Sequence, residues 1–150
     1  MKRPTRLVLG SLLAVAAPAF AQATEPLSIV SGGKTNTFQV EVAATPEARA
    51  KGLGGRDAVA KDHGMVLDYR QVKEQSLVTM KGVKVDLDML FLDSDGTVIA
   101  VATNARGGSL RPVAPGLGAA AVLQIAAGQS AALGIKPGDK VKSKLFGNGG

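Results

Sequence analysis

Two carboxylates, Asp86 and Asp88, are the pair of residues best spaced for chemistry in this chain. They alternate with the apolar residues of the segment 85–92, so in a strand both point to one face, opposite Leu87 and Met89. Paired carboxylates can bind a divalent cation or share a proton. The alternative is that they form the solvated side of an amphipathic strand, and the alternating pattern favours this interpretation.

A second polar group lies in the loop from Ala105 to Pro112, where Arg106 and Arg111 flank two glycines and a serine. Free backbone amides between two arginines can cradle a carboxylate or a phosphate. An exposed, irregular connection is the alternative, and the loop composition favours it. Arg106 and Arg111, together with Asp86, are therefore secondary candidates for ligand binding.

The other residues with chemical potential predict neither a catalytic residue nor a metal or cofactor site. The chain has no cysteine, a single His63 in a polar turn and no Gly-x-Ser-x-Gly elbow, which disfavours a nucleophilic dyad and a zinc centre. Asp93 and Asp95 resemble the start of a calcium loop, but the later ligand positions fail and a hairpin turn explains them. Methionines could bind Cu(I), yet their spacing suits separate core strands.

Short strands must position these side chains, because turn signals recur about every 8 to 12 residues. One helix is expected after Thr45-Pro46 and ends at Gly52, and a second spans 129–133 before Gly134. Strands are expected at 38–42, 65–69, 75–80, 85–92, 97–102, 120–125 and from 140 onward. The order predicts a mainly β (α+β) fold, namely a small barrel-like or rolled antiparallel sheet with two short helices.

The first 21 residues predict a cleavable secretory signal peptide. A positive start is followed by an apolar run from Leu7 to Ala17, and Ala19-Phe20-Ala21 offers a small–x–small cleavage pattern. We expect cleavage after Ala21, with Ala23 as the alternative. The run is shorter than the roughly 20 apolar residues of a membrane span, so no stable span is expected after cleavage. A bacterial protein of this kind would be periplasmic or secreted by the general secretion route.

The expected mature chain does not have the composition of a nucleic-acid-binding protein. The formal charge of +6 falls to +3 without the signal peptide, which leaves 15 basic and 12 acidic residues. Only four aromatic residues remain, too few for stacking platforms. We expect a flexible lead-in with one short strand over residues 22–36, a single domain over 37–145 and a tail over 146–150.

Several motifs agree in order and spacing with one known family. They are Pro46-Glu47-x-Arg49-x-x-Gly52-Leu53-x-x-Arg56, Gly64-Met65, Met80-Lys81, Leu87-Asp88-Met89-Leu90-Phe91-Leu92-Asp93-x-x-Gly96 and Gly134-Ile135-Lys136-Pro137-Gly138-Asp139-x-Val141. With them the chain resembles the DUF192 (UPF0127) family over roughly residues 38–142. The resemblance implies a small exported or membrane-tethered protein with a compact, mainly β fold and no established activity. It also implies a binding patch, of which this chain retains Arg56, Met80, Lys81 and Asp88.

The chain departs from the family pattern in the central motif. Val78 and Thr79 stand where the family usually has an aromatic residue and Trp, and Gly82 and Val83 replace Asn-Thr. A ligand site built on this patch would therefore lack its aromatic wall and its amide.

These observations lead to one hypothesis and two alternatives. The first is a non-enzymatic binding or accessory protein of the cell envelope that recognises a small anionic ligand or an envelope protein. The second is a hydrolase or metal-dependent enzyme that uses Asp86 and Asp88. The third is a purely structural interaction module, in which Arg56, Lys81 and Asp88 would scatter over the surface.

Overall fold

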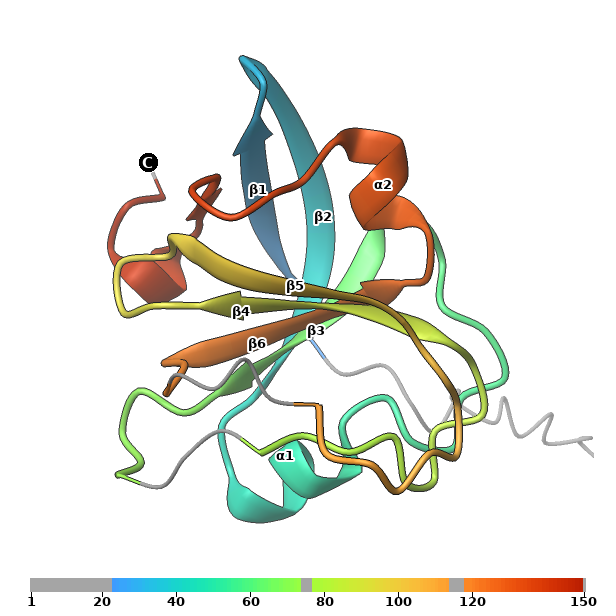
Figure 1. Ribbon diagram of the computed structural model, residues 1–150. Helices are drawn as coiled ribbons and strands as arrows, with labels where there is room; N and C mark the ends of the chain where they lie inside the picture. Colours follow the sequence, from blue (N-terminus) through green and yellow to red (C-terminus); the bar gives the residue numbers. More distant parts are fainter. Residues whose placement is uncertain (1–22, 74–76, 114–117, 150) are drawn as a thin grey trace, which may run out of the picture.

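The computed structural model describes residues 23–73, 77–113 and 118–149, which form a seven-stranded sheet curled into a half-barrel (Figure 1). The sheet order is β5-β4-β6-β3-β2-β1-β7. The elements are β1 (Glu25–Ser31), β2 (Lys34–Ala43), α1 (Pro46–Lys51), β3 (His63–Asp68), β4 (Leu87–Leu92), β5 (Val98–Ala105), β6 (Ala121–Ala126), α2 (Gln129–Leu133), β7 (Lys140–Lys142) and the 3₁₀ turn η1 (Lys144–Phe146). The predicted mainly β fold with two short helices is confirmed. The expected signal peptide, residues 1–21, lies outside the described residues.

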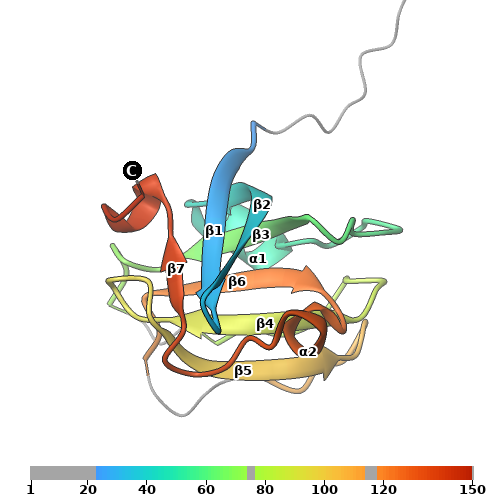
Figure 2. The same cartoon turned by 90° about the horizontal axis from the view of Figure 1, so that it is seen from above.

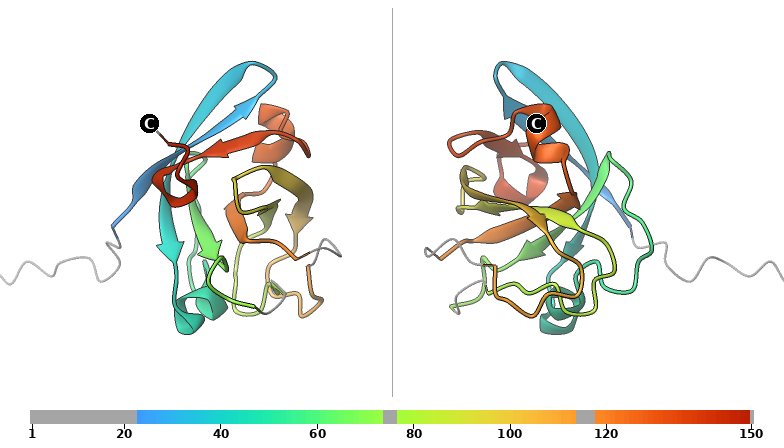
Figure 3. Two further views of the ribbon diagram at one scale, coloured as in Figure 1. Left: turned by 90° about the vertical axis from the view of Figure 1, so that its left-hand side faces the viewer. Right: turned by 45° about the vertical axis from the view of Figure 1, so that its right-hand side comes forward.

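The sheet is not wholly antiparallel. β2 and β3 run in the same direction, in a register that pairs Gln39 with His63 and Ala43 with Leu67. Parallel neighbours need a crossover, which here consists of α1 and the loop that follows it. The crossover places α1 at one end of the sheet, and α2 lies at the other end (Figures 1 and 3).

Both faces of the sheet are buried. The first core cluster packs β1, β2 and β7 against β4 and β6, with Leu90 and Leu123 among its members. The second core cluster lies on the opposite face of β3, β4 and β6, where Met89 and Val122 meet Leu53 and Met80 from loops. Alternate residues of β4 therefore enter different clusters, which explains why all six of its residues are buried. The expectation of a solvated face on this strand is wrong.

Two local signals of the sequence are realised at α1 and at the turn between β4 and β5. Thr45 caps α1 by accepting a hydrogen bond from the Ala48 amide through Oγ1 at 3.2 Å, and Gly52 ends the helix at a φ of +48°. Asp93 accepts from the amide of Gly96, whose φ of +87° suits glycine. No helix among the described residues is long and apolar enough to cross a membrane.

The short strand expected within residues 22–36 is present as β1, its residues Leu27 and Ile29 belong to the core, and β2 begins at Lys34. Other segments differ from expectation. The expected strand at 75–80 is reduced to an isolated bridge between Val78 and Val113, and residues 74–76 lie outside the described part. In the expected tail, the Asn148 side chain donates hydrogen bonds from Nδ2 to two backbone carbonyls.

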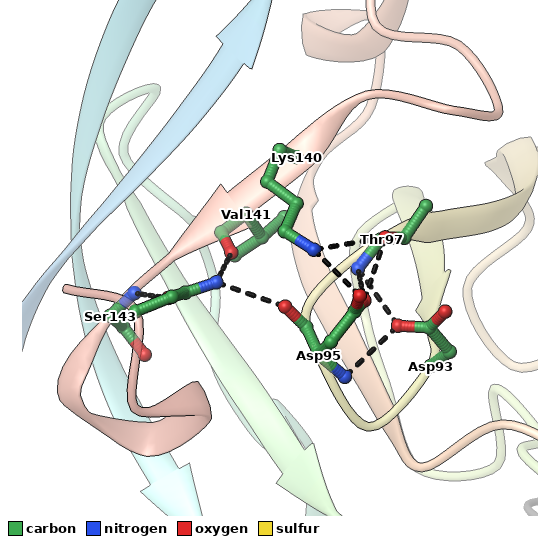
Figure 4. Close-up of polar contacts among 7 residues, drawn as sticks. Asp93, Asp95, Thr97, Lys140, Val141 and Ser143 are labelled. Atoms are coloured by element: carbon green, nitrogen blue, oxygen red, sulfur yellow. Dashed lines mark hydrogen bonds and ion pairs between the residues drawn. The ribbon is translucent and has the colours of Figure 1, made fainter.

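A polar clasp joins the two edges of the curled sheet (Figure 4). Thr97, just before β5, forms an isolated antiparallel β-bridge with Lys140 of β7. The Lys140 ammonium lies 2.8 Å from Asp95 Oδ2. Asn148 donates to the carbonyls of Asp95 at 2.9 Å and of Val141 at 3.0 Å. Figure 2 shows β7 beside β1, so the clasp draws the two ends of the strand order together. The Asp93–Asp95 turn is thus a structural joint, as the hairpin interpretation predicts.

Candidate functional site

The Asp88 carboxylate is fully buried and bound on both oxygens. Oδ1 accepts from the Asn104 amide at 2.9 Å, and Oδ2 accepts from the amides of Gly128 at 3.1 Å and Ser130 at 2.9 Å. These donors belong to β5 and to the start of α2, so one side chain ties three elements together. Asp88 is therefore neither solvated nor open to a ligand.

Asp86 does not join Asp88 in a shared site. It precedes β4, is exposed, and its Oδ1 accepts from the Gly107 amide at 2.9 Å. Within the described residues, no group of three or more His, Asp or Glu side chains is arranged to hold a metal ion. Both carboxylates instead accept hydrogen bonds from backbone amides and hold those segments in place.

The loop with Arg106 and Arg111 does not present a run of free amides. The amide of Gly108 donates to the Met80 carbonyl and that of Ser109 to the Arg106 carbonyl, while the Arg111 amide reaches Ser109 Oγ at 3.3 Å. Gly107 donates its amide to Asp86, so the loop uses these donors to fix itself against the segment 78–80 and not to form the cradle of free amides considered from the sequence. Both arginine side chains are exposed.

Arg56 lies in a small pocket where its charge is already balanced. Its guanidinium is 2.5 Å from a carboxylate oxygen of Glu41, whose residue is only 5% exposed. The pocket has a volume of about 270 Å³ and is also lined by His63 and apolar residues. His63 is exposed as expected, and its hydrogen bond to Asp62 lowers the pKa of that carboxyl. Glu41 alternates with the apolar Val40 and Val42 in the strand expected at 38–42, a pattern that does not indicate its burial.

Met80 and Lys81 are neighbours in the chain but lie in different environments. Met80 is fully buried in the second core cluster, whereas Lys81 is exposed and lines another pocket of about 300 Å³. The four residues implied by the family resemblance therefore do not converge. Arg56 and Lys81 line separate pockets, Met80 is a core residue, and Asp88 lies within the fold.

The pocket of Lys81, which we call the basic pocket, is enclosed by four parts of the fold. They are the end of α1 with Gly52, Tyr69 after β3, the segment 77–83 and Gln124 of β6. Three cationic side chains line it, those of Arg49, Lys51 and Lys81, and no acidic residue of the described chain does. Val78 and Thr79, the positions where the family resemblance expects aromatic residues, are part of its wall.

Arg49 is held in place at the rim of the basic pocket. Its Nη1 donates to the carbonyls of Ala44 at 2.6 Å and Asp68 at 3.1 Å, and its guanidinium carbon lies 5.3 Å from the centre of the Tyr69 ring. Burial raises the pKa of the Tyr69 hydroxyl, which therefore stays protonated at neutral pH. The fixed guanidinium of Arg49 gives the pocket a preformed cationic group.

Gln124 is the polar residue that sequence reasoning missed. It is 2% exposed and stands in the sheet between Met65 and Met89, its register partners on β3 and β4. No described residue donates a hydrogen bond to its Oε1 atom. A Cβ on Gly52 would approach that oxygen to 2.9 Å, so the glycine leaves room for the amide. The available signal was one polar residue in the apolar run 119–126.

Residues 27–143 match the DUF192 family, described as Uncharacterized ACR, COG1430. The chain belongs to this family. The match confirms the resemblance carried by the motifs and covers every wall of the basic pocket.

Two solved structures resemble this DUF192 chain over most of its length. One is a protein of Sinorhizobium meliloti described as a "putative transcription regulator", with 34% identity and a TM-score of 0.78 over 82% of this chain and 95% of that one. The other is a protein of unknown function from Novosphingobium aromaticivorans, with 32% identity and a TM-score of 0.77 over 86% and 94%. No similar sequence was found among the curated proteins.

Proposed function

We propose that this DUF192 protein is a non-enzymatic binding protein that takes a small anionic ligand in the basic pocket. One observation carries the proposal. Three cationic side chains, and no acidic one from the described residues, line a concavity of about 300 Å³. Pockets of this size lie at the lower limit of small-molecule sites, so the ligand is a small metabolite rather than a polymer segment.

The choice of this pocket rests on charge balance. In the pocket of Arg56 the nearby Glu41 carboxylate neutralises the guanidinium, so an incoming anion meets no net positive field. In the basic pocket the Lys81 ammonium is paired with no carboxylate of the described residues. An anion there replaces water around the Lys81 ammonium.

Asp86 and Asp88 both accept hydrogen bonds from backbone amides, which supports binding rather than catalysis as the function. An enzyme based on Asp86 and Asp88 would need carboxylate oxygens that face a substrate. Both Asp88 oxygens accept backbone amides inside the fold, and Asp86 holds Gly107. The hydrolase alternative therefore has no observation in its favour.

The place of action belongs to the same proposal. The features of residues 1–21 support export by the general secretion route, to the periplasm or beyond it. The ligand would then be an anion of that compartment, and the domain would act as an accessory to an envelope process. The description of the Sinorhizobium meliloti protein favours nucleic acid instead. We do not extend it to this chain, because a mature charge of +3 and four aromatic residues give little for nucleic acid to bind.

Calorimetric titration of the purified protein tests the proposal. Succinate serves as the anionic probe, and 1,4-diaminobutane serves as a cation of the same chain length. We expect succinate to bind, with an affinity that falls as salt is raised, and the diamine to give no heat. Lys81→Met should weaken succinate about fivefold, the effect of removing one partly screened charge pair.

Lys84 offers the matched control. It is exposed, lies three residues from Lys81, pairs with Asp57 at 3.0 Å and does not line the pocket. Lys84→Met should leave succinate binding within about twofold of the wild type. Equal losses in both variants would show a diffuse surface charge effect, and that result would overturn the pocket as the site.

A further inference from the structure

The chemistry of Gln124 specifies the ligand further, on the basis of the proposed function. A glutamine between two buried methionines is costly, because Met65 and Met89 donate no hydrogen bond to its Oε1 atom. The large majority of buried side-chain polar atoms in folded proteins have a hydrogen-bond partner. An unpartnered polar side chain that lines a ligand-sized pocket is typical of a residue kept for binding and not for stability.

The unpartnered atom is an acceptor. Gln124 Oε1 can be satisfied only by an N–H or O–H donor, whereas a carboxylate or phosphate oxygen would repel it. The cations of the same pocket require the opposite, an anionic group with acceptor oxygens. One ligand meets both demands if it carries a donor beside its anionic group.

We propose that the basic pocket selects small carboxylates that bear a hydroxyl or amino group, with the anion at Lys81 and the donor on Gln124 Oε1. Hydroxy acids and amino acids form this class. Gln124 is then the specificity-determining residue, and Lys81 supplies affinity for any anion. Gly52 contributes by having no side chain, since a Cβ would meet the Gln124 amide.

A series of four-carbon diacids separates the two roles. Succinate, malate and aspartate share the same carbon chain and differ at one position, which carries hydrogen, hydroxyl or ammonium. Both enantiomers of malate and aspartate are titrated into the purified protein by calorimetry. We expect at least one donor-bearing acid to bind about tenfold more tightly than succinate, the gain of one buried hydrogen bond.

Gln124→Leu removes the acceptor and places an apolar side chain of similar volume between Met65 and Met89. It should reduce the preference for donor-bearing acids, measured against the variant's own affinity for succinate, from about tenfold to less than about twofold. Lys81→Met should weaken all the acids together and keep their ratio. Circular dichroism spectra of both variants check that the fold is retained.

The outcomes distinguish this inference from the proposed function. If all acids bind alike and Gln124→Leu changes nothing, the specificity inference is wrong and the anion pocket stands. If none of the acids gives heat up to about 10 mM, the proposed function fails, and the inference that rests on it fails too. A donor preference that persists in Gln124→Leu would assign selectivity to another group and overturn the role of Gln124.

Discussion

Replacing Asp88 by Asn should destabilise the fold strongly, although the two side chains have nearly the same shape. Asp88 accepts three backbone hydrogen bonds in a fully buried position. An Asn side chain presents one oxygen and one NH₂ group, so at least one of these backbone amides then faces a donor. An unsatisfied buried donor costs about 1–3 kcal/mol, and the remaining bonds lose the strength that the charge gave them. We expect a fall of about 3 kcal/mol in the free energy of unfolding, from the roughly 5–15 kcal/mol typical of a domain.

Urea unfolding followed by circular dichroism measures this loss, and Asp86→Asn is the matched control. Asp86 is exposed and accepts a single amide, for which a neutral amide oxygen is an adequate substitute. The control should lose less than about 1 kcal/mol. If Asp88→Asn stays within about 1 kcal/mol of the wild type, the assignment of Asp88 as a buried structural anchor is wrong.

Three further predictions follow from single side chains. Gly52→Ala should lower the free energy of unfolding by about 1–3 kcal/mol, seen as a lower melting temperature, because the position has a φ of +48° and a Cβ would meet Gln124. Gln124→Leu should stabilise the ligand-free protein by about 1–2 kcal/mol in urea unfolding, since it removes an unsatisfied buried oxygen, and a loss of stability would show that the oxygen is satisfied. The hydrogen bonds from Arg70 hold the pKa of Asp68 below its ordinary value of 3.8. The Asp68–Arg70 pair therefore stabilises the fold above this pH, and that stabilisation is lost as the pH falls through the lowered pKa. Between about pH 6 and pH 2.5, the melting temperature of Asp68→Asn should fall less steeply than that of the wild type. Parallel curves for the two proteins would refute the contribution.

Elements with strong local signals were predictable from the sequence. Thr45, Pro46 and Gly52 determine where α1 begins and ends, because capping and a glycine at positive φ act within one turn. The turn at Asp93–Gly96 is local in the same way. Period two in the segment 85–92 correctly divided its side chains between two faces.

The burial of polar residues could not be predicted, because it depends on elements distant in the chain. Alternation predicted the face of Asp88, but the face is covered by β1, β2 and α2, which no local pattern reveals. The second core cluster likewise lies under the segment 77–83, so Gln124 is buried although it is polar. The crossover after β2 set β3 parallel to it, where short strands and turns favoured antiparallel pairing.

An amide NMR titration of the purified protein with succinate is the most direct test of the basic pocket. We predict saturable shifts of the amides of Gly52, Thr79, Lys81 and Gln124, which belong to three of the four parts of the fold that line the pocket. The amides around Arg56 and His63 should not move, because Glu41 neutralises that pocket. Saturable shifts confined to the Arg56 pocket, or no shifts at about 10 mM succinate, would contradict the account.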